Sequence, residues 1–257
     1  MKLHWKHLIP YGMVMILLVV AGFYDYEINL KMAHALNGID MVFERFAILP
    51  LILIIVACFR LYYVITNQVL FGILSVIASL YAGFDTMHYW CAGMMFYGTS
   101  IIVALLVWVI VAYVVAKIPR AHRQNVAYWM MYFTMVLLLS MLVTTLLKNV
   151  WGRVRFRDGN GISDFTAWYL PQGINGHKSF PSGHTTAWCA ILCFLKMHSH
   201  RPLAWWSRLL IYGLILLMPL TRMSCGAHYL SDTVMGFCIT YTIYLWMSNI
   251  FMKRRLL

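Results

Sequence analysis

Long apolar stretches alternate with short polar segments along the whole chain. A helix needs about 20 mainly apolar residues to cross the hydrocarbon core of a bilayer, and a soluble domain cannot bury many stretches of that length. The pattern therefore predicts an all-α, polytopic bundle of about eight transmembrane helices. The expected spans are residues 9–23, 47–64, 69–84, 99–116, 126–147, 182–197, 209–220 and 228–251.

Two polar segments are too long to be simple turns. Residues 25–45 mix charged and apolar side chains, which predicts an amphipathic helix on the bilayer surface, broken at Asn37 and Gly38. Residues 149–181 are rich in Gly, Asp, Arg and Asn and are long enough to form a functional loop. We expect residues 1–257 to form a single integral membrane domain.

Composition agrees with the pattern. The chain has 257 residues, of which 62% are hydrophobic and 11% charged. Its formal net charge of +12 does not indicate nucleic acid, because Lys and Arg gather on cytoplasmic loops and near anionic headgroups of membrane lipids. Lys2 and Lys6 precede the first apolar stretch and no small-residue cleavage site follows it, which favours a retained signal anchor.

Basic turns set the expected orientation. They lie at residues 117–123, 198–208 and 253–255, and the positive-inside rule places such turns in the cytoplasm. The sequence therefore predicts a multi-pass protein of the cell (inner) membrane with both termini cytoplasmic. Six cysteines lie mostly in apolar segments as packing residues, and no Cys or His cluster completes a metal site, so we expect no metal and no cofactor.

Polar residues that could take part in catalysis or ligand binding occur at predicted helix ends on the opposite, extracytoplasmic face. Pro181 and Ser182 begin a helix, Gly183 permits close approach of a ligand, and His184 stands on the first turn as a proton donor. A helix N-terminus suits a phosphate group. Taken alone, this stretch is more typical of a capped helix with an exposed histidine than of a phosphate site.

Two further clusters lie on the same predicted face. Lys148 and Arg155 flank the end of one span, while Arg222, His228 and Asp232 surround the start of another. Four residues separate His228 from Asp232, one helical turn, so the carboxylate can orient the imidazole for attack on phosphorus. Singly, these residues are typical of snorkelling cations or a structural ion pair, and only their combination indicates a phosphate site.

At these positions the chain resembles the type 2 phosphatidic acid phosphatase superfamily, which includes membrane lipid phosphatases, glucose-6-phosphatase and vanadium haloperoxidases. The resemblance covers residues 146–236 as a phosphatase signature region, and it rests on three motifs: Lys148-x6-Arg155, Pro181-Ser182-Gly183-His184 and Arg222-x5-His228-x3-Asp232. The family has a six-helix core, so the residues before Lys148 include an extra hairpin. Phe156 and Thr221 depart from the family's usual proline and serine, and neither change removes a charge.

The resemblance implies a role for each matching residue. His228 would be the nucleophile that becomes phosphohistidine, Asp232 its orienting partner and His184 the general acid. The implied phosphate-binding residues are Lys148, Arg155, Ser182, Gly183 and Arg222. The expected function is a metal-independent lipid phosphatase, with a lipid A phosphatase, a phosphotransferase of the same superfamily or a transporter as alternatives.

The substrate stays open at this point. Further basic residues could bind a second phosphate, as in undecaprenyl pyrophosphate, or could belong to a solvated loop or contact headgroups: Arg153, Arg157, His177 and Lys178. Phosphatidylglycerophosphate and phosphatidic acid are equally compatible with the motifs. The expected partners are a lipid phosphate or diphosphate and membrane lipids.

Overall fold

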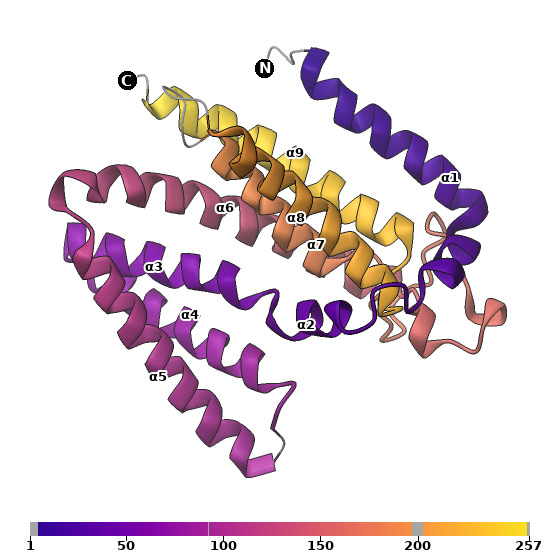
Figure 1. The fold of residues 1–257 in the computed structure, drawn as a ribbon, viewed down its shortest axis with the longest axis horizontal. Coiled ribbons are helices and arrows are strands. Elements are labelled where there is room, and N and C mark those ends of the chain that lie inside the picture. Colours follow the sequence, from indigo (N-terminus) through magenta and orange to yellow (C-terminus); the bar gives the residue numbers. More distant parts are fainter. Residues whose placement is uncertain (1–4, 92, 197–202, 256–257) are drawn as a thin grey trace. The chain divides into compact units, whose positions relative to one another are not determined.

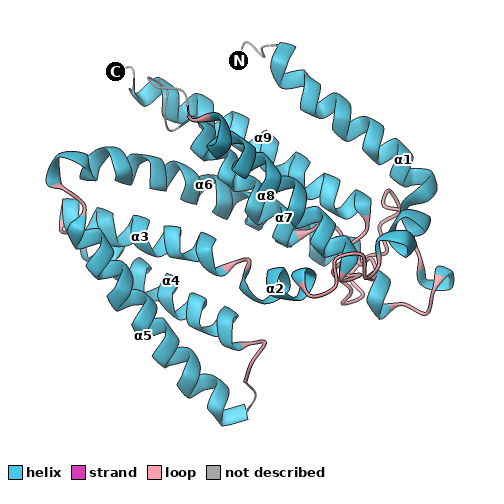
Figure 2. Ribbon diagram, in the orientation of Figure 1, coloured by secondary structure: helices cyan, strands magenta, loops and turns pink. Residues whose placement is uncertain are grey.

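A computed structural model describes residues 5–91, 93–196 and 203–255. These residues form α-helices and short 3-10 helices, with no strand among them (Figures 1 and 2). The α-helices are α1 Leu8–Met32, α2 Ile39–Phe46, α3 Leu49–Thr66, α4 Val69–Met87, α5 Gly93–Lys117, α6 Arg120–Trp151, α7 Gly183–Cys189, α8 Trp205–Ser224 and α9 Leu230–Arg255. The 3-10 helices are η1 Trp5–His7, η2 Phe156–Asp158, η3 Ile162–Asp164 and η4 Ala190–Lys196.

The predicted helical membrane fold is confirmed. Within the described residues, six segments are long and apolar enough to cross a membrane, so this is a multi-pass membrane protein. They are Leu8–Met32, Ile39–Thr66, Val69–Met87, Met95–Lys117, Arg120–Asp158 and Leu230–Phe251. The spans expected at 182–197 and 209–220 correspond to α7 with η4 and to α8, which are not among the six. Lys2 and much of the basic turn at 198–208 lie outside the described residues.

The first helix differs from the prediction. The sequence predicts that the surface segment begins at Asp25, whereas α1 continues to Met32, and residues 33–38 form the turn before α2. The physical reason is that Asp25 does not face headgroups or water. It is 1% exposed and pairs with Arg153, so its charge is satisfied inside the protein and the helix need not end.

The chain divides into two compact units, residues 45–135 and residues 1–44 with 136–257. In the first unit, α3, α4 and α5 pack on one another, and Asn67 in the left-handed conformation ends α3 at the predicted tight turn. Small residues allow α4 and α5 to approach closely: a Cβ atom at Gly83 would lie 2.1 Å from the carbonyl oxygen of Ser100.

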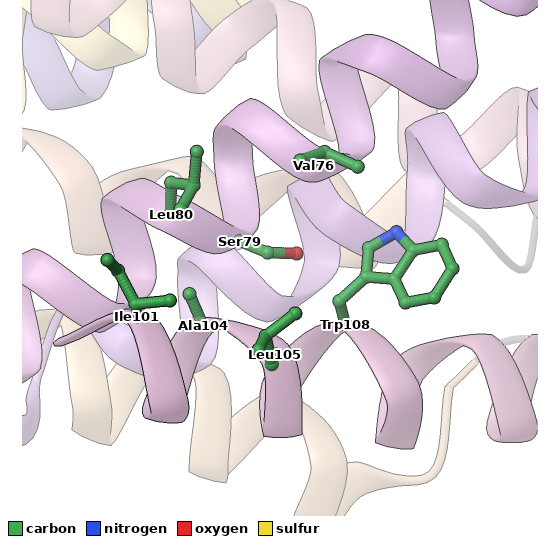
Figure 3. Close-up of a pocket in the computed structure, with 7 residues that line it drawn as sticks. All are labelled: Val76, Ser79, Leu80, Ile101, Ala104, Leu105 and Trp108. Atoms are coloured by element: carbon green, nitrogen blue, oxygen red, sulfur yellow. The ribbon is translucent and has the colours of Figure 1, made fainter. Parts of the chain in front are cut away.

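A pocket opens between α4 and α5 (Figure 3). Its one hydroxyl, on Ser79, donates to the carbonyl oxygen of Ser75, and the other side chains at its wall are apolar or aromatic. The lining residues are Val76, Ser79, Leu80, Ile101, Ala104, Leu105 and Trp108. This pocket holds no titratable group and is not a candidate for phosphate chemistry.

In the second unit, α1 lies antiparallel to α9. Tyr11 is hydrogen-bonded to Thr242 near one end of the pair, and Asp25 accepts hydrogen bonds from Ser231 near the other. Both α7 and α8 also contact α9. The result is a set of packed helices whose ends meet the long loop of residues 152–182, which carries η2 and η3 (Figure 2).

Candidate active site

Ends of four helices bring the predicted site residues together. Lys148 lies in the last turn of α6 and Arg222 in the last turn of α8, while α7 and α9 begin beside them. A Cβ atom added at Gly183 would lie 3.6 Å from Lys148 Cε, and the backbone N–H of Ser182 donates to the carbonyl oxygen of Asp232 at 2.9 Å. Residues separated by up to 84 positions therefore meet at one place, as the three motifs require.

The start of α7 is built as the sequence predicts. Ser182 is the N-cap, and its hydroxyl oxygen accepts a hydrogen bond from the backbone N–H of Thr185. A Cβ atom at Gly236 would lie 2.8 Å from the carbonyl oxygen of Ser182, so the glycine lets α9 approach this turn closely. α7 has only seven residues before the chain tightens into η4, so its dipole is shorter than the sequence implied.

His228 and Asp232 form the pair expected from their spacing. His228 Nδ1 lies 3.5 Å from Asp232 Oδ2, an electrostatic contact longer than a good hydrogen bond. The same carboxylate oxygen accepts hydrogen bonds from the Ser179 hydroxyl at 2.6 Å and from the backbone N–H of Tyr229 at 2.9 Å. Asp232 is completely buried, so these partners hold the carboxylate beside the imidazole.

Neither histidine belongs to one of the six candidate spans, and the environment favours a neutral imidazole on His228. Burial lowers the pKa of His228 to about 3, although Asp232 acts in the opposite direction. Burial also lowers the pKa of His184 well below its ordinary value, and the nearby charges of Arg222, His228, Lys148 and Arg155 lower it further. A neutral imidazole has a free lone pair, which a nucleophile needs.

Three cations lie around the histidines, and they differ in how many hydrogen-bond or ion-pair partners they have within the protein. Lys148 Nζ donates to the carbonyl oxygen of Lys178 at 2.8 Å, and the partly exposed Arg155 lies 4.0 Å from Asp158. Arg222 is only 3% exposed, yet its Nε and Nη1 have no hydrogen-bond partner among the described residues. Buried guanidinium donors without an acceptor are costly, and a phosphate oxygen would satisfy them.

Arg153, one of the residues that could bind a second phosphate, is engaged inside the protein. Its guanidinium is 1% exposed, with Nη1 2.6 Å from Asp232 Oδ1 and Nη2 2.8 Å from Asp25 Oδ2. Nη1 also donates to Ser231 Oγ, and Nε to the carbonyl oxygen of Thr166. All donor nitrogens of Arg153 are therefore used within the protein, and the residue stabilises the buried charge of Asp232.

The other three additional basic residues lie nearer the surface. Arg157 forms a 2.8 Å ion pair with Glu44, and His177 and Lys178 are exposed on the loop. Sequence reasoning did not identify Asp25 and Glu44 as part of this region. Both are acidic residues in a largely apolar N-terminal part, but their basic partners follow more than 100 residues later, so only the folded chain reveals the pairing.

Comparison with family models gives a match over the second half of the chain. A family model described as the PAP2 superfamily matches residues 128–256, slightly more than half of the chain. The chain belongs to the PAP2 superfamily, which confirms the predicted membership. No curated protein and no solved structure gives a match.

Family membership sets the class of reaction. Membership of the PAP2 superfamily, together with the membrane helices, supports phosphatase activity on phosphate esters. The matched residues include the ends of α6 and α8 and the starts of α7 and α9, where the histidines and cations meet. Asp25 and Glu44 lie outside them. Among the described residues no cluster of three or more His, Cys, Asp or Glu side chains could hold a metal ion.

Proposed function

We propose that the protein hydrolyses the phosphate of a membrane lipid through a phosphohistidine intermediate. His228 Nε2 attacks phosphorus, and His184 gives a proton to the leaving oxygen. The negative charge of the bound phosphate would offset the surrounding cations and keep the His184 imidazole protonated for this step. Water then attacks the phosphohistidine, with His184 as the base that accepts its proton. Asp232, held by Ser179 and Tyr229, orients the imidazole and stabilises the charge that it acquires.

The observation that carries this proposal is the buried His228 beside an Arg222 with two unused donor nitrogens. We assign phosphate binding to five residues around them: Lys148, Arg155, Ser182, Gly183 and Arg222. The cations would stabilise the charge on the equatorial oxygens in the transition state. The N-cap hydroxyl and the first N–H groups of α7 would complete the site.

The position of the site residues at the ends of membrane helices supports a lipid as the substrate. A lipid phosphate can reach the helix ends with its chains still in the bilayer, whereas the helices themselves present apolar side chains outward. Candidate lipids are phosphatidic acid, phosphatidylglycerophosphate, undecaprenyl pyrophosphate and lipid A. Of the four basic residues considered for a second phosphate, Arg153 is fully paired and Arg157 is paired with Glu44, which favours a monophosphate.

Phosphate release in the presence of EDTA tests the mechanism and the substrate together. Purified protein in detergent should release phosphate from at least one lipid mono- or diphosphate of a panel, and EDTA should leave the rate unchanged, because no step uses a divalent cation. Orthovanadate should inhibit, since it can accept His228 and adopt five-coordinate geometry. Loss of activity in EDTA with recovery in magnesium would place the reaction in a different mechanistic class.

We also propose that the site faces the periplasm or cell exterior. Arg120 and Lys148 lie about 42 Å apart along α6 at roughly 1.5 Å per residue, close to the full thickness of a bilayer. The basic residues 117–123 and 253–255 then lie at the cytoplasmic ends of their helices, as the positive-inside rule favours. An enzyme of this orientation would act on lipids of the outer leaflet of the inner membrane.

Single-cysteine labelling tests the orientation. In a variant whose six free cysteines are replaced, Ile174→Cys should react with an impermeant maleimide in intact spheroplasts, because Ile174 is 86% exposed on the loop. Ala121→Cys, exposed at the opposite end of α6, should react only after lysis. The reverse pattern would place the site in the cytoplasm.

A further inference from the structure

A short segment that precedes α3 is hydrogen-bonded to the end of α8. We name residues 33–44 the strap. The backbone N–H of His34 donates to the carbonyl oxygen of Ser224 at 2.9 Å, and that of Leu36 donates to the Ser224 hydroxyl at 2.9 Å. The same hydroxyl donates to Asp40 Oδ2 at 3.0 Å. Ser224 follows Arg222 by two residues, so these bonds hold the strap beside the candidate phosphate site.

The strap ends at Glu44, whose carboxylate reaches Arg222. Glu44 Oε1 lies 3.4 Å from Arg222 Nη2, while Arg222 Nε and Nη1 stay without a partner among the described residues. A guanidinium binds a phosphate best through two parallel N–H groups on one edge. Nη2 carries two N–H groups, one on the edge that it shares with Nε and one on the edge that it shares with Nη1. The single contact with Glu44 uses one of them, so the other N–H of Nη2 and the unpaired nitrogen beside it can bind a phosphate at the same time.

Arg157 decides whether Glu44 weakens or strengthens the binding of an anionic ligand. Its Nη1 lies 2.8 Å from the same Oε1 atom, so the charge of Glu44 is already balanced by a second cation. A carboxylate without this partner would repel phosphate. With Arg157 in place, the repulsion is small, and the restraint on the Arg222 side chain is the larger effect.

We infer that Glu44 is a positioning residue for Arg222 and that the strap is a part of the phosphate site contributed from outside the family-matched residues. The inference rests on the proposed function, because it gives Arg222 the role of binding phosphate. Glu44 touches no substrate atom in this scheme. It fixes the guanidinium before the ligand arrives, which lowers the entropy that binding must remove.

Orthovanadate binding provides the first test, since it needs no substrate choice. Glu44→Gln keeps the shape of the side chain and removes its charge, and we expect the Kd for orthovanadate, measured by titration calorimetry in detergent, to rise roughly tenfold, as for loss of a charge-assisted hydrogen bond. The value of kcat/KM for lipid phosphate should fall by a similar factor. Glu27→Gln, an exposed carboxylate on α1, is the matched control and should match the wild type.

A double variant separates positioning from a merely structural role. In an Arg222→Lys protein the planar guanidinium that Glu44 restrains is absent. Adding Glu44→Gln to it should therefore change Kd and kcat/KM by less than twofold. Losses that multiply across the two substitutions would overturn the inference, as would a Glu44→Gln protein with wild-type affinity. Tighter vanadate binding by Glu44→Gln would show that the carboxylate competes with phosphate, which also overturns it. A wild-type protein that binds no vanadate and releases no phosphate would remove the proposed function itself.

Discussion

Replacement of His228 by alanine is expected to lower kcat at least a thousandfold, because the covalent route through phosphohistidine disappears with the nucleophile. The substitution should leave the fold intact, since His228 Nδ1 makes only a long contact with Asp232 and the network around that carboxylate has other donors. The measurement is phosphate release under saturating lipid, together with size-exclusion chromatography of the purified variant.

Asp232→Asn provides the comparison for that experiment. It should cost less than His228→Ala, because the imidazole remains but loses the charge that orients it and stabilises its phosphorylated form. It should also reduce stability, because Arg153 Nη1 loses an anionic partner at 2.6 Å. Near wild-type turnover by the His228→Ala protein would show that phosphoryl transfer does not pass through this residue.

The largest effect on stability is expected at Arg153. Arg153→Gln removes the only guanidinium that joins Asp25 and Asp232 in the described network, and it leaves two buried carboxylates without their cation. Breaking a buried ion pair from one side typically costs about 3 to 5 kcal/mol. We expect the free energy of unfolding, measured by SDS titration in mixed micelles, to fall by that amount.

Two variants give this prediction its controls. Arg157→Gln removes a similar ion pair at a partly exposed site and should change the free energy of unfolding by less than about 1 kcal/mol. Asp25→Asn combined with Arg153→Gln removes one of the stranded charges and should be more stable than Arg153→Gln alone. Equal stability of the Arg153→Gln and Arg157→Gln proteins would contradict a structural role for the buried network.

The sequence was sufficient for those parts of the site that depend on local spacing. His228 and Asp232 are one helical turn apart, and Ser182 caps the helix that begins at Gly183, so their geometry follows from the chain itself. The long apolar stretches likewise predicted most of the helices, because crossing a bilayer demands a minimum length of apolar residues.

Features that depend on distant partners could not be predicted in the same way. Arg153 appeared to be an available cation, because nothing in its neighbourhood of the sequence shows that Asp25 neutralises it. The same absence of a local signal is the reason that the sequence predicts an end of the first helix before Asp25, whereas α1 continues to Met32. A buried charge at Asp25 is acceptable only with its partner, and that partner lies 128 residues further along the chain.

The ion pair between Asp25 and Arg153 also bears on how such an enzyme can diverge. The family match begins at residue 128, but the Arg153 guanidinium that holds Asp232 in place also pairs with Asp25, a residue of α1. A recombination event that exchanged residues 128–256 with those of a relative would separate Arg153 from Asp25. The part of the chain that must be inherited together is therefore larger than residues 128–256, and α1 must be inherited with them or replaced by a helix that supplies an equivalent carboxylate.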